Sequence, residues 1–120
     1  MYRTLLRSKI HRAVVTDVNL NYEGSLVVDS NLLEATGMLE YEQVQVVDIE
    51  NGMRLETYLI KGKAGSGIVQ PNGAAARLLH PGDHIIIMSF IQVPEPIPDN
   101  WLPTIIQVDD HNRIQVGNDE

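Results

Sequence analysis

Short runs of β-branched and aliphatic residues recur along the chain, and residues that favour turns separate them. Such runs are typical of strands. We expect six strands, around residues 14–15, 26–28, 44–47, 58–60, 85–90 and 104–108. Asn51-Gly52 lies between two of these runs and predicts a β-hairpin. Many short strands without a long helix predict a mainly β fold, either a barrel or a sandwich.

Two short helices are expected between the strands. Asn31 and Glu34 have the spacing of a capping box, which predicts a helix over residues 31–38 that Gly37 ends. A second helix is expected over residues 73–79, with Asn72 as its N-cap.

A proline-rich stretch follows the last long apolar run. Its four prolines, at positions 94, 96, 98 and 103, cannot supply central strand pairing. We expect an extended arm here, packed on the surface or on a neighbouring subunit.

Length and composition narrow the class of protein. With 120 residues, 43% of them hydrophobic and 21% charged, the chain is expected to form one globular domain. A net charge of −7 and scattered Lys and Arg argue against a nucleic-acid partner. The lack of cysteine excludes disulfides and thiolate metal sites and fits a cytoplasmic protein. No apolar run approaches the roughly 20 residues of a membrane helix, and no secretory signal is visible, so no membrane partner is expected.

The histidines do not predict a metal site. His80 and His84 are four residues apart, but the Pro-Gly pair between them forbids a helix that would bring both to one face. His11 and His111 are isolated in the sequence. We expect no bound metal.

Tyr22-Glu23-Gly24-Ser25 precedes a predicted strand that begins at Leu26. Gly and Ser are common turn residues, so an ordinary turn explains this dipeptide when it is taken alone. The chemical explanation is self-cleavage. Glycine can be held in a strained conformation with its carbonyl exposed, and the Ser25 hydroxyl could attack that carbonyl to form an ester.

Two other segments carry candidate binding groups. Arg54, Glu56 and Tyr58 share one face of a predicted strand, and Thr57 lies on the other. Arg54 is either a solvated strand charge or a planar fork for a substrate carboxylate. A β-bulge could bring Thr57 and Tyr58 into one pocket. Residues 72–76, Asn-Gly-Ala-Ala-Ala, are either a short capped helix or a helix start whose free N–H groups bind an anion.

Taken in order, these segments resemble the pyruvoyl-dependent aspartate 1-decarboxylase family. The resemblance covers residues 1 to about 92, and the segment after Val93 matches no motif that we can place. It rests on Lys9-Ile10-His11-Arg12-Ala13, Tyr22-Glu23-Gly24-Ser25, Asn51-Gly52 with Arg54, Thr57-Tyr58 and Asn72-Gly73-Ala74-Ala75-Ala76. The resemblance implies a six-stranded double-psi β-barrel with short helices, assembled as a homotetramer with active sites between subunits.

The resemblance also implies a reaction. The chain would cut itself between Gly24 and Ser25 into residues 1–24 and 25–120, and Ser25 would become a covalent pyruvoyl group. This group, without a metal or pyridoxal phosphate, would form a Schiff base with L-aspartate. Decarboxylation would then give β-alanine and CO2, with β-alanine serving pantothenate and coenzyme A biosynthesis.

The residue roles implied by the resemblance fall into three groups. Thr57 would stabilise the oxyanion of cleavage and contact substrate, and Tyr58 would donate a proton to the substrate carbon. Lys9 and Arg54 would hold the side-chain carboxylate of aspartate. The remaining contacts would come from Asn72, Gly73, Ala74 and Ala75, with Tyr22 as a pocket wall. For His11 no role is expected beyond its place near Lys9.

Two other classes of function stay open from the residues alone. One is a non-catalytic small β-barrel that binds a partner, and the other is a hydrolase that keeps Ser25 as its nucleophile. The hydrolase needs a base near Ser25, and no Ser-His-Asp arrangement is evident by spacing. Intact mass separates the classes, because only the self-cleaving enzyme gives pieces of residues 1–24 and 25–120.

Overall fold

The computed structural model describes residues 1–116, which form seven strands, one α-helix and one 3-10 helix. The strands are β1 (Tyr2–Val14), β2 (Ser25–Asp29), β3 (Gln43–Asp48), β4 (Arg54–Gly62), β5 (Val69–Asn72), β6 (His84–Pro94) and β7 (Thr104–Gln107). The helices are α1 (Ser30–Thr36) and η1 (Gly73–Arg77). The mainly β prediction is confirmed, but the described residues form seven strands rather than six.

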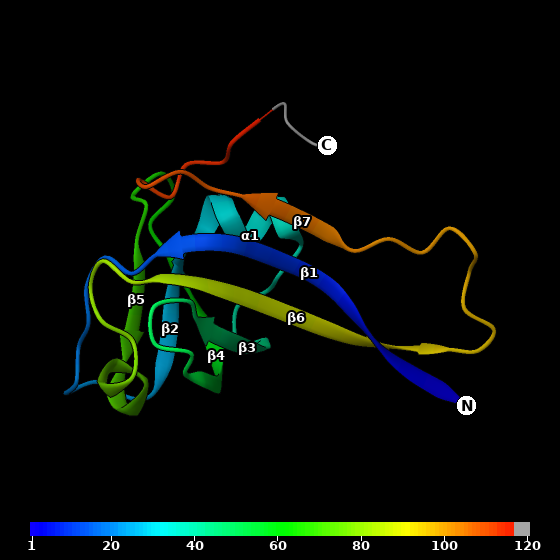
Figure 1. Cartoon of the computed structure of the whole chain (residues 1–120), viewed down its shortest axis with the longest axis horizontal. Helices are drawn as coiled ribbons and strands as arrows, with labels where there is room; N and C mark the ends of the chain where they lie inside the picture. Colours follow the sequence, from blue (N-terminus) through cyan, green and yellow to red (C-terminus); the bar gives the residue numbers. More distant parts are fainter. Residues whose placement is uncertain (117–120) are drawn as a thin grey trace.

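The strands form a sheet in the order β5-β2-β4-β3-β6-β1-β7. β2 is parallel to β4 and β1 is parallel to β7, while the other ladders are antiparallel. Within residues 1–116, the end strands β5 and β7 do not pair with each other, so hydrogen bonds do not close the sheet. Figure 1 shows β1 and β6 as a long twisted ribbon, one end of which projects with the N-terminus beyond the other strands.

Aliphatic side chains from one face of the sheet and from α1 form the core. In β3, Val44 and Val46 are buried and alternate with outward-facing glutamines, as the period of two in a strand requires. Ile10, Leu26 and Ile87 bring three further strands into the same cluster, each fully buried. Burial of an aliphatic side chain of this size contributes about 1.5–3 kcal/mol, so the cluster stabilises the sheet from strand to strand.

Two irregularities bend β1. Its register against β6 shifts between Leu6 and Ser8 and again between His11 and Ala13. Arg12, inside the second shift, has a φ of 69°. A one-residue shift exchanges the two faces of a strand. This explains why Ala13 is buried although it lies three residues, rather than two, after Ile10.

The first helix begins earlier than the sequence predicts. Asp29, not Asn31, is the N-cap of α1, and its Oδ1 accepts the Asn31 backbone N–H at 2.8 Å. The same carboxylate accepts the backbone N–H groups of Gly65 and Gly67, at 3.1 and 2.8 Å. Gly37 ends the helix with a φ of 77°, as predicted. Asp29 acts as the cap because it satisfies a loop and a helix together.

The predicted hairpin at Asn51-Gly52 is confirmed. β3 and β4 are antiparallel, Val47 pairs with Arg54 across the turn, and Gly52 has a φ of 75°. Asn51 Oδ1 accepts the backbone N–H of Met53 at 2.8 Å, which is typical of an asparagine in a turn.

The proline-rich stretch is a connection within the fold. Pro94 is the last residue of β6, and the chain passes through residues 95–103 at the projecting end of the ribbon before it returns as β7. The strand expected over residues 104–108 is confirmed as β7, which pairs with β1.

Asn112 links the segment after β7 to the end of β1 through side-chain hydrogen bonds. Its side chain, in a residue that is 2% exposed, exchanges two hydrogen bonds with the Val14 backbone, one from Val14 N–H at 2.7 Å and one to Val14 C=O at 2.8 Å. Its Nδ2 also donates to the Gly67 carbonyl at 2.8 Å. Three segments far apart in sequence therefore meet at one buried amide.

Across residues 1–116, no helix has both the length and the apolar character needed to cross a membrane.

Candidate active site

Ser25 is the first residue of β2 and pairs with Asn72 of the antiparallel strand β5. Its side chain lies in a buried polar cluster, and the whole residue is 3% exposed. Asn72 Nδ2 donates to Ser25 Oγ at 3.1 Å, and Gln70 Nε2 donates to Asn72 Oδ1 at 2.9 Å. As a donor, the Ser25 hydroxyl makes a long contact, 3.4 Å, to the Glu23 carbonyl.

Asn72 therefore differs from its predicted role. It occupies the N-cap position of η1, but its side chain makes no capping hydrogen bond. Its Oδ1, the atom that a cap uses to accept a helix N–H, accepts from Gln70 Nε2 instead, and its Nδ2 donates to Ser25 Oγ. The helix is also a short 3-10 turn over Gly73–Arg77, where a longer helix was expected.

Gly73 holds the segment that precedes Ser25. Its φ is 64°, and a Cβ atom placed on it would come within 2.7 Å of the Gly24 nitrogen and 2.8 Å of the Tyr22 carbonyl oxygen. Its N–H donates to the Asn19 carbonyl at 2.8 Å. Only glycine allows backbone segments to approach so closely at this φ.

The left-handed conformation that favours glycine is found at Gly73 and not at Gly24, which the sequence suggested as a residue that can be held under strain. Gly24 does not have a positive φ, and a Cβ placed on it would meet no atom within 4 Å. Position 73 is therefore the one that requires glycine, whereas position 24 has open space where a side chain would stand.

A pocket of about 350 Å³ opens beside Gly24. It is lined by Gly24, Leu55, Glu56, Thr57, Tyr58, Ala74, Ala75 and Leu78. The parallel ladder between β2 and β4 begins only at Leu26 and Leu59, so β4 continues past the start of β2. The pocket lies along this unpaired edge, with η1 supplying its small residues.

Thr57 and Tyr58 reach the pocket without the bulge that the sequence suggested. The register of β4 against β3 runs without a shift from Arg54 to Tyr58. Successive side chains of a regular strand point to opposite faces. Because the pocket faces the edge of β4, side chains from both faces border it.

Six expected site residues do not line this pocket. Ser25, Asn72 and Gly73 belong to the polar cluster and the close backbone contact described above, and the other three are Arg54, Lys9 and Tyr22. Arg54 is exposed at the start of β4, where its Nη1 donates to Gln45 Oε1 at 3.0 Å. Lys9 lies on β1, and β6 and β3 separate that strand from β4. At about 4.8 Å between strands, this is ~14 Å along the sheet. The Tyr22 residue is 62% exposed, and its backbone carbonyl oxygen lies close to Gly73.

The structure adds residues that sequence reasoning missed. Gln70 bonds to Asn72, and the Tyr41 ring lies against that of Tyr58 with centroids 6.5 Å apart. Glu56 lines the pocket and accepts a hydrogen bond from Gln43 at 3.2 Å. A period-two pattern over residues 70 and 72 was the available signal for Gln70, but that signal requires β5 to be recognised as a strand.

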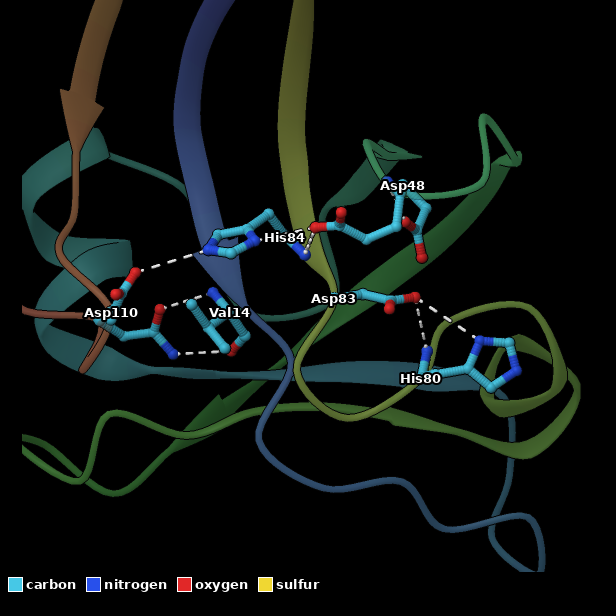
Figure 2. A network of polar contacts seen from close by, with 8 residues as sticks. Val14, Asp48, His80, Asp83, His84 and Asp110 are labelled. Atoms are coloured by element: carbon cyan, nitrogen blue, oxygen red, sulfur yellow. Dashed lines mark hydrogen bonds and ion pairs between the residues drawn. The ribbon is translucent and has the colours of Figure 1, made fainter.

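The histidines have separate partners, as Figure 2 shows for His80 and His84. His80 Nδ1 lies 3.5 Å from an Asp83 oxygen, whereas His84 Nδ1 lies 2.8 Å from Glu50 and its Nε2 3.5 Å from Asp110. Bonds from the backbone N–H and then the ring of His84 lower the pKa of Glu50. Among residues 1–116, no three acidic or histidine side chains group in a way that could hold a metal ion.

His11 lies on β1 and is half-buried. Its Nδ1 is buried and has no hydrogen-bond partner among the residues that the structure describes. Burial lowers the pKa of His11, and the positive charges of Lys9 and Arg12 lower it further. The ring therefore tends toward its neutral form.

Asp48 and Asp83 are drawn with these histidines in Figure 2, and their carboxyl groups affect each other's pKa. Asp48 is fully buried, and its Oδ1 accepts the Glu50 backbone N–H at 2.8 Å. Burial first, and then the neighbouring Asp83 carboxyl group, raise the pKa of Asp48 to about 6. Burial acts in the same direction on Asp83, but the neighbouring Asp48 carboxyl group and the backbone N–H of His80 outweigh it and lower the pKa of Asp83.

Comparison with known proteins places the chain among the decarboxylases. The family model described as aspartate decarboxylase matches residues 1–115, and the chain belongs to that family. The match includes the segment after Val93, which the sequence motifs alone left unassigned.

Several curated relatives are similar over nearly the whole chain. The aspartate 1-decarboxylase of Carboxydothermus hydrogenoformans is 51% identical over 114 residues, which is 95% of this chain and 90% of that protein. That of Corynebacterium efficiens is 52% identical over 120 residues, 99% of this chain and 88% of the relative. That of Bacillus velezensis is 50% identical over 115 residues, which is 96% of this chain and 91% of the relative.

Proposed function

We propose that the chain cuts itself between Gly24 and Ser25 and then decarboxylates L-aspartate to β-alanine and CO2 with a pyruvoyl group made from Ser25. The observation that carries the proposal is the buried Ser25 hydroxyl, held by Asn72 beside a pocket that contains Thr57 and Tyr58. Membership of the aspartate decarboxylase family supports this choice of substrate. The β-alanine would serve pantothenate and coenzyme A biosynthesis in the cytoplasm.

Cleavage begins with the Ser25 hydroxyl. Its Oγ adds to the Gly24 carbonyl carbon, the peptide C–N bond breaks, and the hydroxyl proton passes to the Ser25 nitrogen. We assign to the Thr57 hydroxyl the stabilisation of negative charge on the Gly24 carbonyl oxygen, because both residues line one pocket.

Elimination then separates the two pieces. The Ser25 Cα proton passes to water, the Cβ–Oγ bond breaks, and Gly24 leaves as the carboxylate end of residues 1–24. Addition of water to the resulting double-bonded residue releases ammonia and leaves a ketone at the start of residues 25–120.

The residues around position 25 fit a small ketone of this kind. Ser25 is almost fully buried, Asn72 offers an N–H donor, and Ala74 and Ala75 leave room at the pocket. When formed, the pyruvoyl group condenses with the substrate amine and accepts the electrons released as CO2 leaves. The proposal uses this covalent group alone, without a metal or pyridoxal phosphate.

Side chains of the pocket then position and protonate the substrate. The Tyr58 hydroxyl is assigned the proton that the substrate Cα receives, and the Tyr41 ring supports Tyr58 from outside. The backbone of Gly73, Ala74 and Ala75 contacts the remaining substrate atoms.

Lys9 and Arg54 are assigned to the distal carboxylate of aspartate, which requires a neighbouring copy. Both lie outside the pocket of their own chain, so we place them, with the exposed Tyr22 ring, at a site between subunits of a homotetramer. Uncovered apolar side chains at the projecting end of the β1–β6 ribbon support association, since Tyr2 is 65% and Phe90 42% exposed.

We also propose that strands β1 to β6 close into the six-stranded double-psi barrel that the resemblance implies, with β7 added at an edge. The bends in β1 and the mixed parallel and antiparallel pairing support this topology.

Intact mass and product analysis test the proposed function together. The wild-type chain is expected to give pieces of residues 1–24 and 25–120, the larger of which reacts with a hydrazine reagent. Ser25→Ala should stay at full length and form no β-alanine. A wild-type chain that remains whole and leaves L-aspartate unchanged would favour a non-catalytic binding module. A whole chain with hydrolytic activity lost in Ser25→Ala would favour a serine hydrolase.

A further inference from the structure

Gln70 and Asn72 lie on the same face of β5, directed toward the start of β2. They are two residues apart in one strand, and Asn72 pairs with Ser25 while Gln70 pairs with Val27. Their amides form a relay that ends at the Ser25 hydroxyl, with distances of 2.9 Å and 3.1 Å.

The direction of this relay matters because Asn72 is fully buried. An asparagine amide can turn over with little change in shape, and a serine hydroxyl can donate or accept. Ser25 therefore does not decide which end of the Asn72 amide it meets. In the structure, Gln70 Nε2 donates to Asn72 Oδ1, and the opposite end of the Asn72 amide, Nδ2, donates to Ser25 Oγ.

We infer that Gln70 is a positioning residue for self-cleavage, acting through the orientation of the Asn72 amide. This inference rests on the proposed function. Negative charge develops on Oγ when the Cβ–Oγ bond breaks and both electrons pass to the departing Gly24 carboxylate. An N–H group directed at Oγ stabilises that charge, whereas a carbonyl oxygen in its place would oppose it.

The test exchanges the donor at position 70 for an acceptor of the same shape. In Gln70→Glu, the ionised carboxylate can only accept, so it binds Asn72 Nδ2 and turns Oδ1 toward Ser25. Freshly purified chains are incubated, and the cut fraction is followed by intact mass. We expect cleavage to slow by about tenfold or more at pH 7.5. Gln107→Glu adds the same charge on the exposed strand β7 and should cut at the wild-type rate.

Acid separates an orienting role from a merely structural one. Below the ordinary glutamate pKa of about 4.3, the carboxyl group introduced by Gln70→Glu gains a proton that it can donate to Asn72 Oδ1. The cleavage rate of Gln70→Glu relative to Gln107→Glu should therefore rise toward one as the pH falls from 7.5 to 4. Gln70→Met, which neither donates nor accepts in this way, should cut at an intermediate rate with no such acid recovery.

The outcomes distinguish this inference from the function on which it rests. If wild type and Gln107→Glu cut while Gln70→Glu cuts equally fast at every pH, Gln70 has no positioning role and self-cleavage still stands. If wild type itself stays whole, both proposals fail. Should Gln70→Glu not fold at pH 7.5, Gln70→Met decides, because an unchanged rate in that variant overturns the inference.

Discussion

The Cα of Gly73 faces the backbone of Gly24 so closely that a methyl group on Gly73 would overlap the Gly24 nitrogen, at 2.7 Å. The absence of a side chain on Gly73 thus allows the Gly24 backbone to lie in contact with it. The bond proposed to break is therefore positioned by a residue far along the chain.

We predict that Gly73→Ala slows cleavage between Gly24 and Ser25 by roughly tenfold or more, because the added methyl group would push the Tyr22–Gly24 segment away from Ser25 Oγ. Gly52→Ala is the matched control, since Gly52 has a similar φ of 75° but no atom within 4 Å of the added group. It should lose about 1–3 kcal/mol from the strained φ alone and still cut. Intact mass gives the cleavage, and thermal unfolding the stability. Equal cleavage in both variants would contradict the contact.

Tyr58→Phe and Thr57→Val should separate the two reactions of the pocket. Tyr58→Phe is expected to cut normally and then lose about 10²–10⁴ in decarboxylation rate, the usual contribution of a positioned acid. Thr57→Val is expected to accumulate uncut chain. Intact mass and β-alanine production are measured on both variants. A Tyr58→Phe protein that is cut and fully active would show that another group supplies the proton.

Arg54→Ala should abolish turnover of aspartate while cleavage proceeds, because Arg54 lies outside the pocket beside Gly24. Loss of a buried charged pair with the substrate would cost on the order of 2–5 kcal/mol in kcat/KM. Lys63→Ala removes an exposed cation elsewhere and should leave kcat/KM unchanged. Glutamate should be a poor substrate for the wild type, since its distal carboxylate lies one methylene too far. Similar rates on the two amino acids would refute the assignment of Arg54.

Asp48 should make the chain less stable as the pH rises from about 4 to 6. Its folded pKa of about 6 lies above the ordinary value of 3.8, so in this range the folded state holds a proton that the unfolded state has lost. The stabilisation is therefore full below about pH 4 and lost above about pH 6.

Asp48→Asn keeps the neutral form at every pH. We expect it to raise the free energy of unfolding by about 1–2 kcal/mol at pH 7.5 and to give no gain at pH 4. Thermal unfolding on the Ser25→Ala background keeps all samples uncut. The exposed Asp99→Asn should show no such pH-dependent gain. A constant difference between Asp48→Asn and its parent at all pH values would exclude the buried acid as the cause.

The sequence predicted correctly the turn and the helix end that depend on the conformation of a single residue. Asn51-Gly52 and Gly37 are correct because each turn or cap needs a left-handed residue at that position. β1 was recognised only at its end, because the shift at Arg12 breaks the period of two between Ile10 and Ala13. β5 was missed because it is four residues long and contains Pro71. The sheet accepts this proline because β5 is an end strand.

The site shows the same division. The family motifs brought Ser25 and Asn72 to attention, but no local pattern shows that residues 47 positions apart share a hydrogen bond. That contact depends on the pairing of β2 with β5, which is a property of the whole sheet. The role of the Asn72 side chain was equally hidden, since the sequence predicts a helix cap, and only the fold shows that its Oδ1 accepts from Gln70 and its Nδ2 donates to Ser25.

The first 24 residues include β1, which is an inner strand of the sheet. They would therefore remain part of the folded protein after a cut at Gly24. β1 lies between β6 and β7, and its Ile10 and Ala13 are fully buried. The Asn112 side chain makes two hydrogen bonds to the backbone at the end of this strand. A cut after Gly24 would break one covalent bond and leave all of these contacts in place. The two pieces would then persist as a tightly associated heterodimer, and separately made polypeptides of residues 1–24 and 25–120 should reassemble by fragment complementation.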